Sequence, residues 1–208
     1  MSMGAPREGG KDGASTRDLI LDVAERLFAE HGFAGVSVRQ IAADAGLKNQ
    51  ASLYHHFRNK LALYEAVIKR GLDPVIEVLG RSDAEPAGPV LDQLIDHLSK
   101  RPHLPRLIWR AGLDESKDLR RVVGRLLRPL YDTGYETLAR TAIDWEESDM
   151  PHLAIGLFQL IFGYFANVSL FAGAMPDDPA SPEAIERQRR FLKTAYVRLL
   201  GDGSGRLH

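Results

Sequence analysis

Apolar residues recur along most of the chain at spacings of three and four, the period of an amphipathic α-helix. The first such stripe lies between Ser15 and His31 and ends before Gly32. It consists of Leu19, Ile20, Val23, Ala24, Leu27 and Phe28. No stretch shows the strict alternation that is typical of half-buried strands. The pattern therefore predicts an all-α protein.

The next stretch, from Ser37 to Lys60, predicts two short helices and the start of a third. Ser37 and Gln40 have the spacing of a capping box, in which each side chain satisfies an amide at the helix start. Gly46 stands where the first short helix should stop in the left-handed conformation. Asn49 is suited to cap the second short helix. Helix, glycine turn and helix form the helix-turn-helix arrangement that places its second helix in the DNA major groove.

This arrangement has a buried side and a polar side. Leu53 and Phe57 are expected to point inward, and Asn59 is available to cap the following helix. Between residues 36 and 60, four cations (Arg39, Lys48, Arg58 and Lys60) accompany a single acid, Asp44. The formal net charge of the whole chain is −1. A basic patch on a nearly neutral chain favours a local contact with DNA.

The segments VSVRQIAADAG and SLYHHFRNKLALYEAV resemble the N-terminal domain of the TetR/AcrR family of bacterial transcriptional regulators, over Thr16 to Ile68. The resemblance implies a three-helix, helix-turn-helix head followed by a larger helical domain for ligand binding and dimerisation. The turn at residues 48–51 is one residue longer than the commonest family turn. The register at the start of the recognition helix therefore stays open.

The resemblance and the groove-facing pattern together give a set of candidate DNA-binding residues. These are Ser37, Arg39, Lys48, Gln50, Ser52, Tyr54, His56 and Lys60. Gln50 is suited to an adenine edge, and Ser52 to a base or a phosphate. Tyr54 and His56 match family positions that mostly hold the DNA backbone. Lys60 is expected to contact phosphate, aided by the positive end of its helix.

The helix that follows Lys60 contains Pro74, and a kink or break is expected near Arg70 because proline removes a backbone hydrogen bond. Three further helices are predicted at about residues 89–100, 105–113 and 119–142, the last broken or bent near Pro129. A final helix should begin at Ser181-Pro182 and end at Gly201.

Residues 153–175 contain no charged side chain, and the stretch is long enough to span a bilayer. It includes polar residues and three glycines, and no cations flank it as anchors. A helix that is hydrophobic all round is equally typical of one buried between subunits. We therefore expect a homodimer formed through residues 153–175 and 182–200, as in the family, with membrane association as the alternative.

The predicted domain organisation has four parts: a flexible arm (1–14), the DNA-binding head (15–60), the ligand-binding and dimerisation domain (61–201) and a flexible tail (202–208). Arg7 and Lys11 would allow the arm to enter a minor groove. The effector is expected to be a small, apolar or aromatic molecule. Its candidate contacts are the aromatic residues of the middle helices: Trp109, Tyr131, Tyr135, Phe158 and Phe162.

Composition narrows the function classes. The 208 residues include no cysteine, which excludes disulfides, thiolate catalysis and Cys-ligated zinc. Neither a P-loop nor a nucleophile elbow or HExxH motif is present, so we expect no enzyme, no cofactor and no metal. The N-terminus has no apolar core for a secretory signal, and we expect a cytoplasmic protein. The leading hypothesis is a ligand-responsive repressor at a pseudo-palindromic operator, with an activator or a ligand-independent regulator as alternatives.

Overall fold

The computed structural model describes residues 15–81, 87–141, 145–175 and 177–200. Within these ranges all regular secondary structure is helical, so the all-α prediction is confirmed. The predicted arm (1–14) and tail (202–208) lie outside the described residues.

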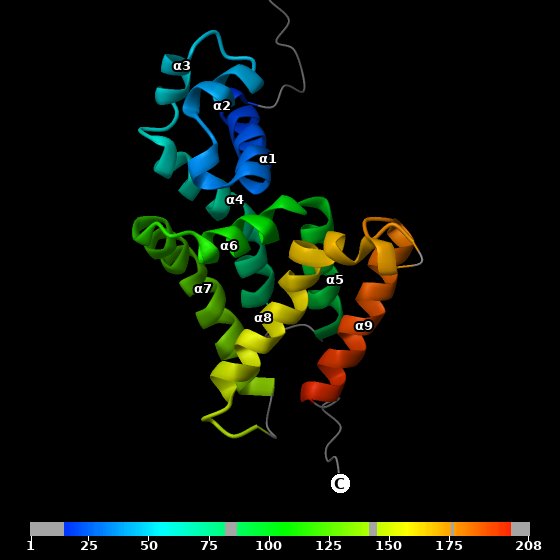
Figure 1. The fold of residues 1–208 in the computed structure, drawn as a ribbon. Coiled ribbons are helices and arrows are strands. Elements are labelled where there is room, and N and C mark those ends of the chain that lie inside the picture. Colours follow the sequence, from blue (N-terminus) through cyan, green and yellow to red (C-terminus); the bar gives the residue numbers. More distant parts are fainter. Residues whose placement is uncertain (1–14, 82–86, 142–144, 176, 201–208) are drawn as a thin grey trace, which may run out of the picture.

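The N-terminal part is a small head formed by α1 (Thr16–Gly35), α2 (Val38–Asp44) and α3 (Gln50–Tyr54) (Figure 1). Ser15 caps α1, since its hydroxyl accepts a hydrogen bond from the Asp18 amide. The backbone of α1 leaves helical geometry at Gly32, where φ is 76°. The apolar stripe predicts a helix that ends at Gly32, whereas the structure has a kink there and a last helical turn that reaches Gly35.

The larger part lies below the head in Figure 1, and α4 (Lys60–Gly80) runs from one into the other. It comprises α5 (Ala87–Lys100), α6 (His103–Leu113), α7 (Lys117–Thr141), α8 (Met150–Asn167), the 3₁₀ helix η1 (Val168–Ala174) and α9 (Pro182–Leu200). The Ser181 hydroxyl accepts a hydrogen bond from the Ala184 amide, which confirms the predicted start of the last helix.

Two prolines lie inside helices that nonetheless continue. α4 extends through Pro74 to Gly80, and α7 extends through Pro129 to Thr141. The chain therefore does not break at Arg70 or at Pro129. Packing of both helices along the body outweighs the loss of one backbone hydrogen bond at each proline.

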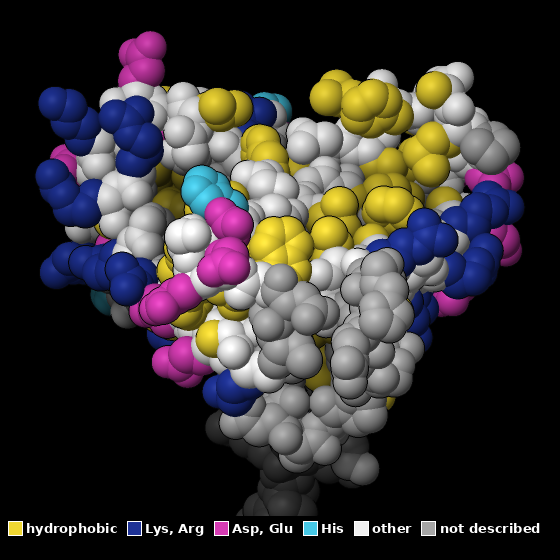
Figure 2. All heavy atoms as spheres, turned by 90° about the horizontal axis from the view of Figure 1, so that it is seen from below, with side chains coloured by type: hydrophobic (Ala, Val, Ile, Leu, Met, Phe, Trp, Pro, Cys, Tyr) yellow, Lys and Arg dark blue, Asp and Glu magenta, His cyan; other side chains and the backbone are white. Residues whose placement is uncertain are grey.

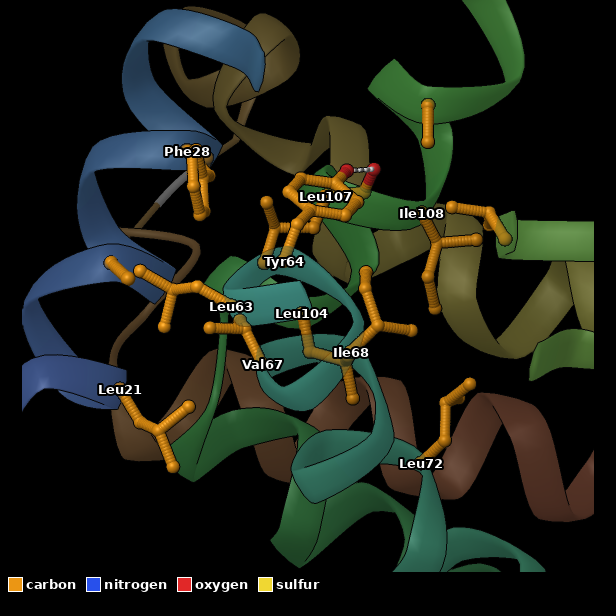
Figure 3. Close-up of a cluster of buried hydrophobic side chains, with 14 of the residues drawn as sticks. Leu21, Phe28, Leu63, Tyr64, Val67, Ile68, Leu72, Leu104, Leu107 and Ile108 are labelled. Atoms are coloured by element: carbon orange, nitrogen blue, oxygen red, sulfur yellow. Dashed lines mark hydrogen bonds between the residues drawn. The ribbon is translucent and has the colours of Figure 1, made fainter. Parts of the chain in front are cut away.

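One hydrophobic core runs without interruption from the head into the body (Figure 3). Phe28 of α1 meets Tyr64 of α4 edge to face, with their ring centroids 5.0 Å apart. The Tyr64 hydroxyl donates a hydrogen bond to the Leu107 carbonyl of α6 over 3.2 Å. Burial raises the pKa of Tyr64 well above its usual range, so this hydroxyl remains a donor. The head and the larger domain thus share one core across α4.

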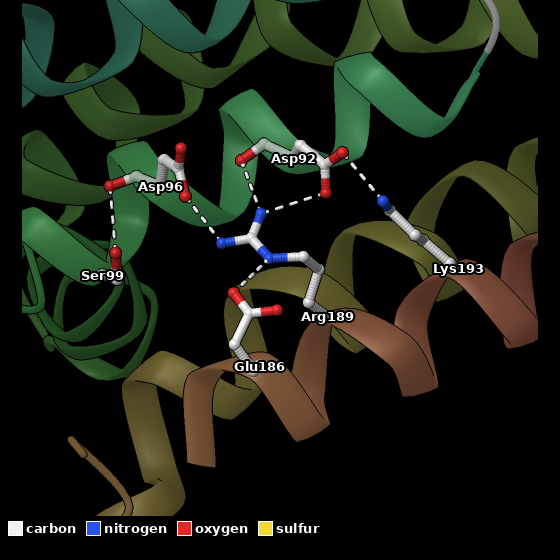
Figure 4. Close-up of polar contacts among 6 residues, drawn as sticks. All are labelled: Asp92, Asp96, Ser99, Glu186, Arg189 and Lys193. Atoms are coloured by element: carbon white, nitrogen blue, oxygen red, sulfur yellow. Dashed lines mark hydrogen bonds and ion pairs between the residues drawn. The ribbon is translucent and has the colours of Figure 1, made fainter. Parts of the chain in front are cut away.

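Polar contacts fasten α9 to α5 (Figure 4). The Arg189 guanidinium lies 3.1 Å from Oδ1 of Asp92, 2.6 Å from Oδ1 of Asp96 and 2.9 Å from Oε1 of Glu186. Lys193 adds a contact of 2.8 Å to the other oxygen of Asp92. Because Arg189 is mostly buried, this cluster holds the last helix in a fixed register against the body.

Candidate DNA-binding interface

The first helix of the helix-turn-helix begins at a serine cap. The Ser37 hydroxyl accepts a hydrogen bond from the Gln40 amide over 3.1 Å. Ile41 and Ala42 are buried against α1, so α2 presents its other side, including Arg39, to solvent. The cap satisfies one orphan amide and fixes where α2 starts.

The turn after α2 depends on Gly46. Its φ is +70°, a conformation that residues with a Cβ rarely adopt. A Cβ at this position would have no neighbour within 4 Å. Conformation rather than space therefore explains the glycine, and the predicted left-handed stop is confirmed.

The recognition helix α3 is capped by Asn49, whose Oδ1 accepts hydrogen bonds from the Ser52 amide (3.0 Å) and the Ser52 hydroxyl (3.3 Å). α3 ends at Tyr54, earlier than the spacing of Leu53 and Phe57 indicates. The amides of residues 56 and 57 both donate to the Leu53 carbonyl, which tightens the chain into a turn. Phe57 reaches the core from this turn rather than from the helix.

The candidate DNA-binding residues on the solvent side of the helix-turn-helix differ in how freely they could contact DNA. Arg39, Lys48, Gln50, Tyr54 and His56 are exposed, and Tyr54 retains 48% of its surface. The hydroxyls of Ser37 and Ser52 already take part in helix caps. An exposed aromatic side chain beside exposed amide and cationic groups is suited to phosphate and base edges.

Lys60 is the first residue of α4, which Asn59 caps by accepting the Ala62 amide over 2.8 Å. Its ammonium lies 4.4 Å above the ring of Phe33, in cation–π geometry. Burial lowers the pKa of Lys60. To contact a phosphate, the Lys60 ammonium would therefore have to leave the Phe33 ring or to contact the ring and the phosphate at the same time.

Two contacts of α1 complete the electrostatics of the head. Asp44, the acid in this stretch, is paired with Arg26 at 3.0 Å. The Arg17 guanidinium lies 5.0 Å from the ring centroid of Phe57, which brings an exposed cation beside the end of α3. The sequence pattern gave no signal for Arg17, because only the packing of α1 places it there.

The body contains an apolar cavity of about 270 Å³ between α4, α5, α7, α8 and α9. Three of the five aromatic residues proposed for effector binding, Tyr131, Phe158 and Phe162, line this cavity. Phe158 and Phe162 stack with their ring centroids 4.5 Å apart. None of the residues that line the cavity is charged.

The other two candidates lie outside the cavity lining. Tyr135 stacks on Tyr131, and Trp109 of α6 lies near Gly163 of α8, with 3.8 Å between the indole and a Cβ built on that glycine. The aliphatic side of the cavity, including Val75, Leu94 and Leu130, carried no sequence signal that separates it from ordinary core. Among the described residues, no group of three or more acidic or histidine side chains could hold a metal ion.

Comparison with known proteins agrees with this geometry. Residues 20–67 match the family model for bacterial regulatory proteins of the tetR family. The HTH-type transcriptional repressor SCO4008 of Streptomyces coelicolor is 32% identical over 105 residues, which are 50% of this chain and 53% of that protein. The repressor KstR2 of Mycolicibacterium smegmatis is 43% identical over 60 residues, 29% of each chain. The chain thus spans about half or less of the length of the curated relatives it matches.

Solved structures extend the likeness to most of the chain. SCO4942 from Streptomyces coelicolor has 27% identity and a TM-score of 0.60, covering 88% of this chain and 97% of that one. The fatty acid degradation regulator FadR from Bacillus halodurans shares the fold at 17% identity, with a TM-score of 0.66 over 94% of this chain and 100% of that one. Regulators of this type bind DNA and are not enzymes, as expected for this chain. Residues 20–67 therefore form a DNA-binding domain of the tetR family, on a fold that the chain shares along nearly its whole length with the solved structure of SCO4942.

Proposed function

We propose that this protein is a ligand-responsive transcriptional repressor that binds a pseudo-palindromic operator as a homodimer. The observation that carries the proposal is the structure of the head. Two capped helices, α2 and α3, are joined at Gly46, and they have a polar side that faces solvent and an apolar side that is buried. The matched relatives SCO4008 and KstR2 are named as repressors, which supports repression rather than activation of transcription.

Within the head, we assign base reading to Gln50 and backbone contacts to most of the other candidates. Gln50 is the first residue of α3 and is exposed, as a residue that reaches a base edge must be. Lys48, Tyr54 and His56 flank it and would hold phosphates, with Arg39 and Ser37 at the start of α2. Ser52 would reach a base or phosphate while its hydroxyl supports the cap. Lys60 and Arg17 would add phosphate contacts at the two edges.

The dimer would form through α8 and α9. Residues 150–174 are long and apolar enough to cross a membrane by composition, yet only 22% of the most apolar window is buried within this chain. Exposed apolar side chains include Ile155 on α8, Leu170 and Phe171 on η1, and Phe191 and Val197 on α9. Figure 2 shows hydrophobic side chains gathered between two flanks of lysine and arginine. Pairing with a second copy would remove this surface from water.

A membrane-associated helix is the competing explanation for the same apolar surface. It would require α8 to leave its contacts with α6 and α7, which include Phe162 and Phe165 in the shared core. A dimer buries the exposed side of α8 while keeping these contacts, so we favour the dimer. Recovery of the protein without detergent, as a dimer by sedimentation, would exclude the membrane alternative.

The effector would occupy the cavity between α4, α5, α7, α8 and α9. Its uncharged lining favours an apolar or aromatic molecule, because a charged group there would lose its hydration without gaining an ionic partner. The effector would release DNA by binding more tightly to a state in which the two heads no longer match the operator. The cavity contacts α4, which carries the head, at Val75 and Leu79.

The test is selection of genomic DNA fragments by the purified wild-type protein, compared with an Arg39→Ala, Tyr54→Ala, Lys60→Ala triple variant. The expected result is enrichment of a few palindromic intergenic sites that the variant does not retain. The genes beside these sites would then indicate the effector. Equal enrichment by both proteins, with the variant folded by circular dichroism, would contradict the assignment of the head.

A further inference from the structure

Besides the shared core, polar contacts at two separate points of α1 join the head to the larger domain. The first point is Glu25, in the middle of the helix, and the second is the end of the helix at Glu30 and Gly32. Neither contact is needed to form the helix-turn-helix itself, whose core consists of apolar residues.

Glu25 is 6% exposed, and it is the one polar or charged residue among the described residues that is buried. Its Oε2 atom accepts hydrogen bonds from Nη2 of Arg70 and from Nη1 of Arg101, each over 3.0 Å. Arg70 belongs to α4, and it also lies 2.8 Å from Oδ1 of Asp22. Arg101 lies between α5 and α6, so it reaches Glu25 from the larger domain alone.

The second point involves Arg110 of α6. Its Nη1 atom donates a hydrogen bond to the Glu30 carbonyl over 3.3 Å. A Cβ at Gly32 would lie only 3.0 Å from Nη2 of the same side chain, so the guanidinium packs directly on this glycine. A cation at the carbonyl end of α1 is also favoured by the helix dipole.

Glu25 and Gly32 are seven residues apart, which is about 10 Å along a helix. The shared core already packs α1 against α4 and α6, and two polar contacts at this separation resist rotation of α1 on that core more than one contact does. A buried carboxylate with two arginines contributes little net stability, since desolvation offsets the attraction, but it accepts only one geometry. The arrangement therefore serves orientation better than it serves stability.

We propose that the Glu25–Arg101 contact is a positioning contact that fixes the direction of the head against the body, and that it thereby sets the half-site spacing the dimer accepts. The inference rests on the proposed binding of a palindromic operator by a dimer. Half-site spacing is a geometric consequence of how rigidly two heads are held. Loosening one contact in each subunit should let the heads reach half-sites at other separations.

The experiment uses full-length protein and one palindromic fragment selected by the wild type, with derivatives carrying one or two base pairs inserted at the centre. Binding is measured by fluorescence anisotropy for the wild type and for Arg101→Gln. This variant leaves Glu25 paired with Arg70, so the buried carboxylate keeps one partner. We expect the ratio of affinities for the original and altered spacings to fall about tenfold, the effect of losing one interaction of moderate strength.

Two control variants separate orientation from charge and folding. Arg128→Gln removes an equal charge from an exposed pair with Asp132 on α7 and should keep the wild-type ratio. Arg101→Lys keeps the positive charge, and its ratio of affinities for the original and altered spacings should lie between those of Arg101→Gln and the wild type. An unchanged ratio in Arg101→Gln would overturn the inference, and so would an equal loss of affinity at every spacing. If the wild type itself selects no fragment, the proposed function fails instead.

Discussion

At the scale of single residues, Gly32 and Gly46, the glycines with positive φ in the described ranges, show how a local conformation is encoded. Gly46 has open space around its Cα, so its constraint is purely conformational. Gly32 combines a positive φ with close contact to Arg110. The sequence predicts the stop at Gly46 and a helix end at Gly32, where the structure has a kink, because glycine at the end of an apolar stripe is a local signal. The guanidinium beside Gly32 could not be predicted, since Arg110 is far away in the chain.

Replacing Gly46 with alanine should destabilise the protein by about 1–2 kcal/mol, the cost of a left-handed conformation for a residue with a Cβ. The matched variant Gly124→Ala lies on the exposed side of α7, where no atom obstructs a Cβ. It should stabilise the protein by about 1 kcal/mol. Urea unfolding followed by circular dichroism measures both. Equal effects of the two substitutions would show that Gly46 is not conformationally constrained.

His97 of α5 gives a second residue-scale prediction, on pH. Its Nε2 atom lies 2.9 Å from the Gly71 carbonyl, and burial lowers the pKa of His97. In the unfolded chain a histidine binds its proton near pH 6.5, whereas the folded chain resists protonation until lower pH. The free energy of unfolding should therefore decrease as pH falls below about 6.5.

The variant His97→Gln retains a donor for the Gly71 carbonyl but does not titrate. We expect its unfolding free energy to depend less on pH between 7.5 and 5.5 than that of the wild type, as measured by urea unfolding at both values. Arg101, Lys100 and Glu25 also influence the pKa of His97, and they are unchanged in this variant. The same pH dependence in both proteins would contradict the role given to His97.

At the scale of elements, α4 packs closely against α6 at Gly71. A Cβ built on Gly71 would lie 2.6 Å from Cδ1 of Leu104, which is fully buried. Gly71→Ala should therefore destabilise the protein by about 1–3 kcal/mol through overpacking, although alanine favours helices elsewhere. Leu104→Ala alone should cost about 2–5 kcal/mol, because it leaves a cavity.

The double variant tests whether these two costs share one contact. In Gly71→Ala with Leu104→Ala, the added methyl group fills part of the space that the leucine vacates. We expect the combined loss of stability to be smaller than the sum of the single losses by more than about 0.5 kcal/mol. Strictly additive values would place the strain of Gly71→Ala somewhere other than at Leu104.

The elements themselves were largely predictable, since helix caps and apolar stripes are local features. Ser37, Asn49, Asn59 and Ser181 all cap helices where the sequence indicated. The continuity of α4 through Pro74 could not be predicted from the sequence. Local propensity favours an interruption at a proline, and tertiary packing overrides it. Of the effector candidates, Trp109 and Tyr135 lie outside the cavity lining. Residue type alone cannot distinguish aromatic residues that line the cavity from aromatic residues that pack beside it.

At the scale of the whole molecule, the proposed dimer depends on the exposed apolar side chains of α8, η1 and α9. Phe191 of α9 is 53% exposed, and Ile155 of α8 is 49% exposed. The cluster around Arg189 directs the opposite side of α9 toward α5, so Phe191 is free to meet a second copy. Phe191→Glu would place a charge without a partner in that interface.

We expect Phe191→Glu to keep its helical content, since the side chain is exposed in the single chain, and to weaken the dimer by about 100-fold or more in dissociation constant. Sedimentation velocity over a range of concentrations measures this change. Leu113→Glu is the matched control, because Leu113 is 80% exposed on α6, and it should remain a dimer. The monomeric variant should also lose most affinity for a palindromic fragment while retaining its affinity for a single half-site. If Phe191→Glu sediments as the wild type does, the dimer forms through another surface, and the apolar side of α8 and α9 needs a different partner.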